Sequence, residues 1–346
     1  MNQSDTDKLL KRRLYVQRYV TQTFNDTIET IAPHDRELIT LIRDFIDDAS
    51  EADLQALGHR RRDGKAAELV RAVKAILRAE RDEAEQVVRD ATEQLLKREL
   101  IVTQNVVNPE KEPPSSAGLI ALAVGGMALS ERIRAAFNNI SRRVITTLST
   151  GADSSPEVIV AMIRGRRSQR FKDGVFYWRN ERVLRPDIDL IINGGAGHAA
   201  KRVYQRNGYE YVQWLATLDG RVCSVCFRNE AEGTYPINRH PPYPAHPKCR
   251  CVLQFVDDPE RIRVARPYVR DDRPVSRIPK SERPGKIGQT RDTITQFFDR
   301  WTEAEKKDWL GPTKYELLRS GKVKSVSELV DSRTWRPLRL DQLPEV

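Results

Sequence analysis

The four cysteines of this 346-residue chain form two close pairs, Cys223-Ser-Val-Cys226 and Cys249-Arg-Cys251. A C-x2-C turn lets two thiolates point at one centre. A second pair from a later segment can complete the tetrahedron that zinc prefers, with sulfurs about 2.3 Å from the ion. Prolines between the two pairs stiffen the connecting loop and lower the entropy lost when the site closes. The spacing therefore predicts a zinc site with the ligands Cys223, Cys226, Cys249 and Cys251.

The second cysteine pair leaves an alternative ligand set open. In a regular strand the side chains of Cys249 and Cys251 would point to opposite faces, so both can bind one ion only if the chain kinks, as Pro247 would allow. Otherwise a histidine, His246 or His240, takes the fourth position and one cysteine is buried. We favour four thiolates. The cysteines could instead form disulfides or be inert buried thiols, and disulfides are uncommon in a reducing cytoplasm.

A zinc whose four positions are all filled by protein is structural, because a catalytic zinc keeps one position open for water. Asp219 and Glu230 lie close in sequence and would serve an open site, which is the less favoured alternative. A nucleophilic pair of cysteine and histidine is conceivable on composition, but catalytic cysteines usually act singly. The sequence therefore favours a binding protein, without catalytic residues, over an enzyme.

Lysine and arginine outnumber aspartate and glutamate by 59 to 49, which gives a net charge of +10. This balance favours polyanionic partners, with ordinary solubility as the alternative because the charge is spread along the chain. The polar start, Met1 to Asp7, does not resemble a secretory signal. The most apolar run, Ala117 to Leu129, is too short to span a bilayer and is predicted to be a buried helix or a helix and turn. We therefore expect a soluble protein made in the cytoplasm.

The first hundred residues are predicted to be helical. Apolar residues recur at helical spacing from Lys8 to Ile31, Pro33 is expected to end that helix, and a second helix is expected from Asp35 to Phe45. A long helix from about Lys65 to Val106 contains no proline or glycine and carries a narrow apolar stripe. Such a stripe fits self-association through a coiled-coil contact, or a helical hairpin inside the same domain.

A segment rich in proline and serine, 108–116, is predicted to be a linker between domains. Helices are expected after it from Ser130 to Leu148 and from Pro156 to Ile163. A basic cluster follows, and the aromatic residues beside it would either stack on nucleic-acid bases or, as we favour, form the half-buried edge of a core. The cluster comprises Arg164, Arg166, Arg167, Arg170 and Lys172, and the aromatic residues are Phe171, Phe176, Tyr177 and Trp178.

Tyr209 to Ala216 and Cys251 to Val256 are rich in aromatic and β-branched residues and are predicted to be the strands that enter and leave the cysteine cluster. We call residues 214–256 the Cys module. The predicted fold class is α+β, mainly helical, with a small β Cys/His zinc module. The predicted divisions are a helical N-terminal domain with the long amphipathic helix (1–107), the linker (108–116), a central domain that ends in the Cys module (117–256), an extended arm rich in proline and arginine (257–290) and a helical tail (291–346).

Two blocks of this sequence resemble the phage head-morphogenesis family, also called the phage Mu protein F-like or minor head protein family. The first block runs from Trp214 through Asp219-Gly-Arg221 and the C-x2-C pair to His246-Pro247-Lys-Cys249-Arg250-Cys251. It is similar to the family's Trp-led strand, followed by D-x-R-x-C-x2-C and H-P-x-C-R-C. The second block, Asp308 to Leu343, is similar to the tail that often follows this module. The resemblance covers roughly 156–343, and the N-terminal half matches no family that we can name.

Two segments depart from the family pattern. Ile191 to His198 stands where members commonly carry an Ala-Arg-Thr-Glu-like helix, and Asn229 to Gly233 replaces a common Leu-Asp-Gly. These changes bear on local helix packing more than on the Cys module.

The resemblance implies a minor structural protein of a tailed phage head, present in few copies at the portal vertex or inner head surface of the virion. It implies a part in head assembly or in DNA packaging and ejection, with the portal protein or the major capsid protein as partner, and no reaction. Packaged double-stranded DNA is a further candidate partner that the basic charge fits, and no membrane is expected during assembly. In this account Asp219 and Arg221 form a structural pair that braces the Cys module.

Two other functions are weighed against this one. A zinc-dependent nuclease of the HNH or treble-clef type would need a metal-binding histidine pair and a general base beyond the structural zinc. Of the five histidines in the chain, only His240 and His246 lie near the cysteines, which counts against that alternative. A zinc-ribbon DNA-binding protein would bind DNA sequence-specifically on its own.

Overall fold

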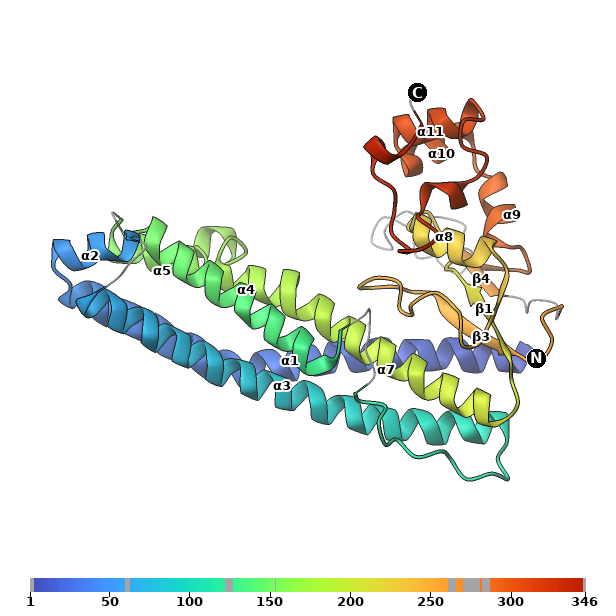
Figure 1. Cartoon of the computed structure of the whole chain (residues 1–346), viewed down its shortest axis with the longest axis horizontal. Coiled ribbons are helices and arrows are strands. Elements are labelled where there is room, and N and C mark those ends of the chain that lie inside the picture. The colour runs from blue at the N-terminus through green and yellow to red at the C-terminus, as the bar shows by residue number, and fades with distance from the viewer. Residues whose placement is uncertain are drawn as a thin grey trace. The chain divides into compact units, whose positions relative to one another are not determined.

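The computed structural model describes residues 3–59, 63–121, 127–152, 154–260, 266–269, 281 and 287–344. The protein is mainly helical, with one three-stranded and one two-stranded antiparallel sheet (Figure 1), which confirms the predicted α+β class at this level. The chain divides into two compact units. We call residues 16–99 and 115–199 the helical unit, and residues 1–15, 100–114 and 200–346 the module unit. Each unit combines segments that are distant in sequence. The domain boundaries drawn from the sequence stay a prediction.

Three long helices form the centre of the helical unit: α1 (Gln3–Asp48), α3 (Gly64–Val107) and α7 (Arg185–Arg206) (Figure 1). Tyr19 on α1 donates a hydrogen bond to the carbonyl of Ala91 on α3 (2.9 Å), and Gln17 on α1 donates one to Asn193 on α7 (3.1 Å). The long helix predicted over 65–106 is confirmed. Its apolar stripe is buried within the unit, as the hairpin alternative requires, and self-association through this helix stays a prediction; the buried residues include Leu69, Val73, Ile76, Leu77, Ala84, Val88, Leu95 and Leu96.

The helix α7 runs through the glycine-rich segment that departs from the family pattern. A β-carbon at Gly195 would lie 3.5 Å from side-chain atoms of both Leu96 and Thr92, so this helix passes close to α3 where its residues are small. Glycine costs helix stability of about 1 kcal/mol relative to alanine. Close packing of the two backbones offsets that cost, which the sequence pattern alone does not reveal.

The predicted end of the first helix at Pro33 is wrong, because α1 continues unbroken through this residue. A proline inside a helix removes one backbone hydrogen bond and costs about 3 kcal/mol. Ile31, Leu38 and Ile42 flank the proline and are completely buried. Burial of each such side chain contributes about 1.5–3 kcal/mol, so the packing of the helix on both sides outweighs the local cost.

Shorter helices complete the helical unit: α2 (Glu51–Gly58), α4 (Leu129–Thr150), α5 (Pro156–Arg164), α6 (Val175–Trp178), a 3-10 turn (Arg167–Gln169) and a π-helical turn (Arg179–Leu184). The predictions for α4 and α5 are confirmed. Helix α2 was not predicted, although Ser50 and Asp53 form a capping box that the S-x-x-D spacing signals. In the apolar run after the linker, 117–121 form a turn and 122–126 lie outside the described residues.

A buried ion cluster joins the π-helical turn to α1 and α3. The guanidinium of Arg179, which is fully buried, donates hydrogen bonds to Asp35 on α1 (2.6 and 2.8 Å) and to Glu80 on α3 (2.6 Å). Burial raises the pKa of Glu80 to about 7. Each of these charges would be costly inside the unit without its partners, so the cluster fixes how the three segments pack.

The variant Arg179→Met tests this cluster. It removes the shared cation and leaves two carboxyl groups without their partner, so the free energy of unfolding should fall by about 3 kcal/mol or more. Urea denaturation of the full chain measures the change. Arg89→Met is the matched control, because Arg89 forms an i,i+4 pair with Glu85 at the surface and its loss should cost about 0.5 kcal/mol. Equal effects of the two variants would contradict the assigned role.

The module unit is built around the three strands β1 (Tyr211–Leu215), β2 (Thr234–Pro236) and β3 (Val252–Val256), in the order β2-β1-β3. The two predicted strands are confirmed as β1 and β3. The helix α8 (Ser224–Ala231) lies between β1 and β2 in the chain. The core around the sheet is aromatic and includes Tyr204, Trp214, Phe227, Tyr235 and Phe255.

The predicted helical tail is present as α9 (Ile294–Asp299), α10 (Glu303–Leu310) and α11 (Pro312–Arg319), followed by 3-10 turns at Val326–Leu329 and Leu340–Gln342. Its aromatic residues pack on the Cys module. The indole nitrogen of Trp309 donates a hydrogen bond to the carbonyl of Val222 (2.7 Å), and the rings of Phe298 and Phe227 lie 5.4 Å apart. The tail and the Cys module therefore share one core.

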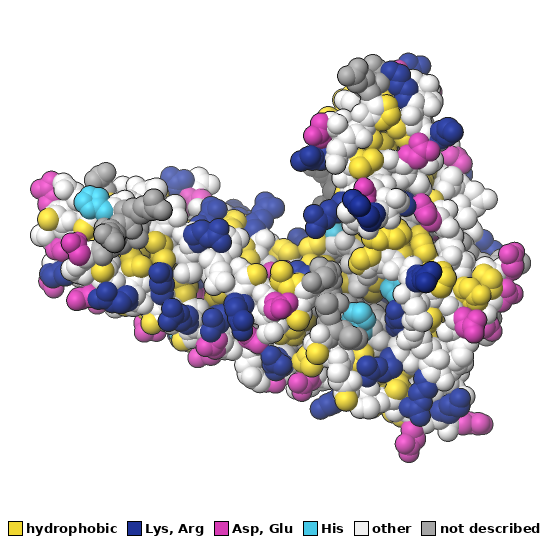
Figure 2. Space-filling model, viewed as in Figure 1, with side chains coloured by type: hydrophobic (Ala, Val, Ile, Leu, Met, Phe, Trp, Pro, Cys, Tyr) yellow, Lys and Arg dark blue, Asp and Glu magenta, His cyan; other side chains and the backbone are white. Residues whose placement is uncertain are grey.

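The region predicted to be an extended arm contains two short paired strands, β4 (Arg266–Val269) and β5 (Ile287–Thr290). Between them only residue 281 is described. Within the described ranges, no helix combines the length and the apolar character needed to cross a membrane. Basic and acidic side chains are interspersed over the face shown in Figure 2, as the even spread of charge along the sequence predicts.

Candidate metal centre

Strand pairing brings the two cysteine pairs to one end of the three-stranded sheet. The last residue of β1, Leu215, pairs with the first residue of β3, Val252. Cys251 stands directly before β3, and Cys223 follows β1 after a short connection. The antiparallel register therefore places two sequence-distant pairs beside each other.

The first pair lies at the start of α8. Cys223 is the N-cap residue of this helix, and its sulfur accepts a hydrogen bond from the backbone nitrogen of Cys226 (3.3 Å). The N-terminus of a helix carries partial positive charge, which stabilises a thiolate. Hydrogen bonding to the thiol of Cys226, and secondly to His246, lowers the pKa of Cys223 to about 4. The helix start is thus suited to hold one cysteine in the form that binds metal.

The second pair avoids the geometry of a regular strand. Residues 249–251 precede β3, and the chain turns just before them, where Lys248 is left-handed (φ 60°) and the nitrogen of Cys249 donates to the carbonyl of His246 (3.1 Å). Cys249 and Cys251 are both buried, and their sulfurs lie within 4.8 Å of the sulfur of Cys226. The kink that four thiolate ligands require is therefore present, one residue after the expected Pro247.

His246 joins the same cluster from the proline-rich loop. Its Nε2 atom lies 3.4 Å from the sulfur of Cys226, and its Nδ1 atom lies 2.7 Å from the carbonyl oxygen of Pro247. A ring that donates from Nδ1 keeps the lone pair of Nε2 free for a metal ion. The hydrogen bond with Cys223 raises the pKa of His246 to about 9. The other candidate, His240, belongs to neither group of potential ligands among the described residues.

One sulfur pair of the cluster has the spacing of a tetrahedral zinc site. Two sulfurs bound at about 2.3 Å from one zinc ion lie about 3.8 Å apart, and the sulfurs of Cys226 and Cys249 are 3.7 Å apart. The potential ligands form two groups, Cys223 with Cys226 and His246, and Cys226 with Cys249 and Cys251. Cys226 belongs to both groups. The cluster can therefore hold a metal ion, and it offers five donors for four positions.

The charges within the cluster also call for a cation. Hydrogen bonds from the thiols of Cys226 and Cys251 lower the pKa of Cys249, whereas the pKa of Cys226 is raised by its hydrogen bonds with Cys223 and Cys249 and that of Cys251 by burial. Neighbouring buried thiolates repel one another, so the thiols cannot all ionise together. A bound divalent cation removes that conflict, because it deprotonates coordinating thiols.

Asp219 supports the turn of the second pair through Arg250, whose role the sequence pattern did not predict. The carboxylate of Asp219 is buried and accepts two hydrogen bonds from the guanidinium of Arg250, one of them at 2.9 Å. The predicted partner, Arg221, lies 3.8 Å away with a side chain that is 79% exposed. Arg221 contributes mainly through its backbone nitrogen, which donates to Asp219 (3.0 Å). Arg250 occupies the middle of the C-R-C sequence, which was the available signal for this role.

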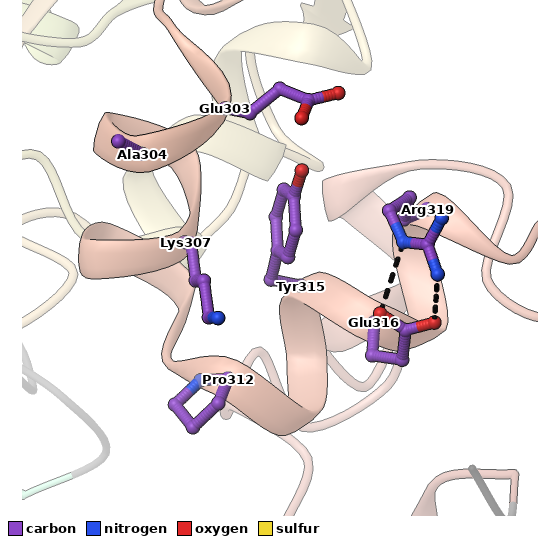
Figure 3. A pocket seen from close by; sticks show the side chains of 7 residues that line it. All are labelled: Glu303, Ala304, Lys307, Pro312, Tyr315, Glu316 and Arg319. Atoms are coloured by element: carbon purple, nitrogen blue, oxygen red, sulfur yellow. Dashed lines mark hydrogen bonds and ion pairs between the residues drawn. The ribbon is translucent and has the colours of Figure 1, made fainter.

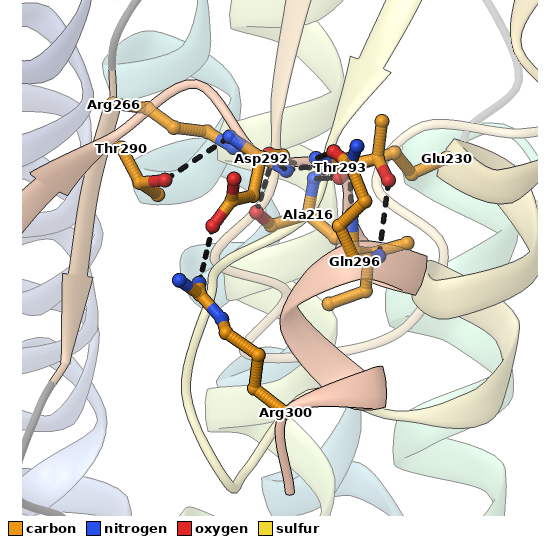
Figure 4. A network of polar contacts seen from close by, with 9 residues as sticks. Ala216, Glu230, Arg266, Thr290, Asp292, Thr293, Gln296 and Arg300 are labelled. Atoms are coloured by element: carbon orange, nitrogen blue, oxygen red, sulfur yellow. Dashed lines mark hydrogen bonds and ion pairs between the residues drawn. The ribbon is translucent and has the colours of Figure 1, made fainter.

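Glu230, the second carboxylate considered for an open site, is fully occupied by structural contacts (Figure 4). It is completely buried and accepts hydrogen bonds from Arg266 (2.5 and 2.7 Å) and from the backbone nitrogens of Ala216 (2.7 Å) and Ile294 (2.8 Å). Arg266 also donates to the carbonyls of Ala216 and Asp292, both at 2.9 Å. The network therefore anchors Arg266, the first residue of β4, to the Cys module and to the tail. The sequence did not predict this role, because the residues around Arg266 are mostly proline and polar residues.

A surface pocket between α10 and α11 offers no catalytic arrangement (Figure 3). Its charged side chains carry both signs, and Glu316 and Arg319 are joined by an ion pair (2.6 Å). The residues that line it are Glu303, Ala304, Lys307, Pro312, Tyr315, Glu316 and Arg319. A cysteine or histidine nucleophile with an adjacent base is missing from this lining. The cysteine cluster is therefore the stronger candidate site.

No protein-family model, curated protein or solved structure matches the chain.

The variant Asp219→Asn tests the brace of the Cys module. It leaves the guanidinium of Arg250 without its carboxylate, so the free energy of unfolding should fall by about 1–3 kcal/mol. Arg221→Gln is the control and should change it by about 0.5 kcal/mol or less, because the side chain is exposed and its ion pair is long. Thermal denaturation of both variants measures the difference. A larger effect of Arg221→Gln would show that the wrong arginine has been assigned.

Proposed function

We propose that the cysteine cluster binds one structural zinc ion through Cys223, Cys226, Cys249 and Cys251. The observation that carries this proposal is the sulfur spacing of 3.7 Å between Cys226 and Cys249, together with the burial of three of the four cysteines. Thiolates select zinc over the harder divalent cations, and a tetrahedron of thiolates leaves no position for water. His246 is the alternative fourth ligand, since its Nε2 atom is also within reach of Cys226.

Zinc content of serine and alanine variants tests the ligand set. Wild-type chain should contain about one zinc ion, and Cys226→Ser should lose it most completely because its sulfur belongs to both ligand groups. With four thiolate ligands, His246→Ala keeps the zinc while each of Cys223→Ser, Cys249→Ser and Cys251→Ser lowers metal affinity by about tenfold or more. Elemental analysis after exhaustive dialysis gives the content. Retention of zinc in Cys226→Ser would contradict the proposal.

The bound ion would join two segments that the sheet only brings near each other. The helix start at Cys223 and the turn at Cys249 belong to different elements, and each packs against the aromatic core of the module unit. Arg13, near the start of α1, donates a hydrogen bond to the carbonyl of Cys249. Zinc would therefore hold in place the turn at Cys249, which also receives a hydrogen bond from the N-terminal helix.

We further propose that the protein is a minor structural component of a tailed phage head, bound to the portal or to the inner capsid. The support is the ordered pair of motifs, the Trp-led strand with its cysteine pairs and the tail after Asp308. In the structure these two blocks share one aromatic core, because the indole of Trp309 donates a hydrogen bond to the carbonyl of Val222 (2.7 Å) and its ring lies 5.9 Å from that of Phe227. Such packing between the blocks is a physical reason for the two motifs to occur together. The protein would act in head assembly or in DNA packaging and ejection by binding.

The nuclease alternative is less well supported by the contacts. A general base needs a free carboxylate or imidazole beside the metal. Glu230 is occupied by Arg266 and backbone nitrogens, and Asp219 is occupied by Arg250. Among the described residues, His246 is the one histidine that lies within reach of the sulfur cluster. Both carboxylates are engaged in ion pairs and hydrogen bonds that hold the fold together. Binding is therefore the function that the geometry supports best.

Mass spectrometry of purified virions tests the proposed location. Heads of the phage that encodes this chain should contain it in few copies, and portal protein should co-purify with it from disrupted heads. The variant Trp309→Ala should lower its incorporation, because the tail is then no longer hydrogen-bonded to Val222 in the Cys module. Arg319→Ala, which removes only an exposed ion pair, is the matched control. Absence of the chain from virions, with abundant chain in the lysate, would contradict the proposal.

A further inference from the structure

The connection between α5 and α6 carries a concentration of positive charge that the zinc site does not explain. Residues 164–174 (Arg-Gly-Arg-Arg-Ser-Gln-Arg-Phe-Lys-Asp-Gly) contain five cations and one carboxylate. The net charge of the whole chain is only +10 over 346 residues. This short segment, which we call the basic loop, therefore departs strongly from the even spread of charge elsewhere.

The basic loop is held in one shape. Its single carboxylate, Asp173, accepts hydrogen bonds from the backbone nitrogen (2.8 Å) and the side chain (2.5 Å) of Arg166. A β-carbon added at Gly174 would lie 2.2 Å from the backbone nitrogen of Gly165, so the two ends of the loop meet at bare backbone. Arg170 and Phe171 are both left-handed (φ 51° and 60°), at a cost of about 1 kcal/mol or more for each. The fold thus maintains a strained loop whose cations repel one another.

The cations of this loop are available to a ligand. Every residue from 166 to 173 is exposed, and across the described part of the chain Arg167, Arg170 and Lys172 have no acidic partner. Three of the aromatic neighbours, Phe176, Tyr177 and Trp178, are half-buried, as the sequence predicted. Arg143 of α4 lies over the ring of Trp178 (4.4 Å), and Arg179 lies over that of Phe176 (4.9 Å). Phe171 is the exception, 43% exposed on the loop itself.

We propose that the basic loop is a contact site for the phosphate backbone of duplex DNA, with Arg167, Arg170 and Lys172 as the phosphate-binding cations. The loop is continuously exposed, which suits an extended polyanion better than a small anion, since a small anion needs enclosing donors. Duplex DNA presents a phosphate charge for about every 1.7 Å of its axis, so several neighbouring cations can be neutralised together. Neutralisation would relieve the repulsion that the rigid loop maintains. This inference rests on the proposed function, because a phage head is what would bring duplex DNA to the loop.

Binding of a fluorescent duplex of about 30 base pairs by the full chain tests the site. The variant carries Arg167→Gln, Arg170→Gln and Lys172→Gln. The matched control carries Arg71→Gln, Lys74→Gln and Arg78→Gln, three exposed cations of α3 in the same unit. Both variants lose the same charge. The loop variant should weaken binding about tenfold or more in about 100 mM salt, and it should reduce the slope of log Kd against log salt by about 2–3, since each phosphate that is no longer neutralised accounts for about 0.9. The control should weaken binding less than about threefold.

Unfolding curves of both triple variants should superimpose on that of the wild type, because the replaced side chains have no ion pairs to lose. Equal weakening by the two variants would overturn the proposal, since bulk charge would then explain binding. Unchanged binding in the loop variant would overturn it as well. A preference of about tenfold for single-stranded DNA that Phe171→Ala abolishes would replace the duplex assignment with base stacking. Virion content is measured separately, so failure to bind DNA and failure of the head-protein proposal are distinguishable.

Discussion

Electrostatic repulsion between buried sulfurs is the constraint on which the module unit depends. Three buried cysteines and one half-buried cysteine converge with an imidazole at one end of a small sheet, where the thiols cannot all ionise together. The β1–β3 register and the start of α8 bring them to the same end of the sheet. A divalent cation would convert this repulsion into attraction. Its bonds to cysteines of both segments would link the turn at Lys248 to the helix start at Cys223.

The surroundings of the cluster are ordered by ion pairs in which the carboxylate is buried. Asp219 with Arg250 supports the second cysteine pair, and Glu230 with Arg266 joins the module to the strand β4 and the tail. The helical unit uses the same principle in the cluster of Arg179, Asp35 and Glu80. Such pairs contribute little net stability compared with apolar packing, but a misplaced partner leaves an unpaired buried charge. They therefore select one arrangement of segments that are distant in sequence.

The parts of this structure that follow local rules could be predicted from the sequence. The long helix over Gly64–Val107, the strands around Trp214 and Phe255 and the convergence of the cysteines all follow from periodicity or spacing. Long-range contacts could not be predicted. The helix continues through Pro33 because buried neighbours outweigh a local penalty. The role of Arg266 became recognisable only when the fold placed it against the carboxylate of Glu230. A polar segment of the sequence does not indicate which of its arginines the fold will bury.

X-ray absorption at the zinc edge, recorded on the full chain as purified, tests the central claim most directly. A closed structural site predicts a four-coordinate ion with sulfur neighbours at about 2.3 Å, either four of them or three with one imidazole nitrogen at about 2.0–2.1 Å. An oxygen neighbour from water in place of one of these ligands would contradict the account, because the ion would then have an open position for chemistry. A folded chain that binds no ion would contradict it as well.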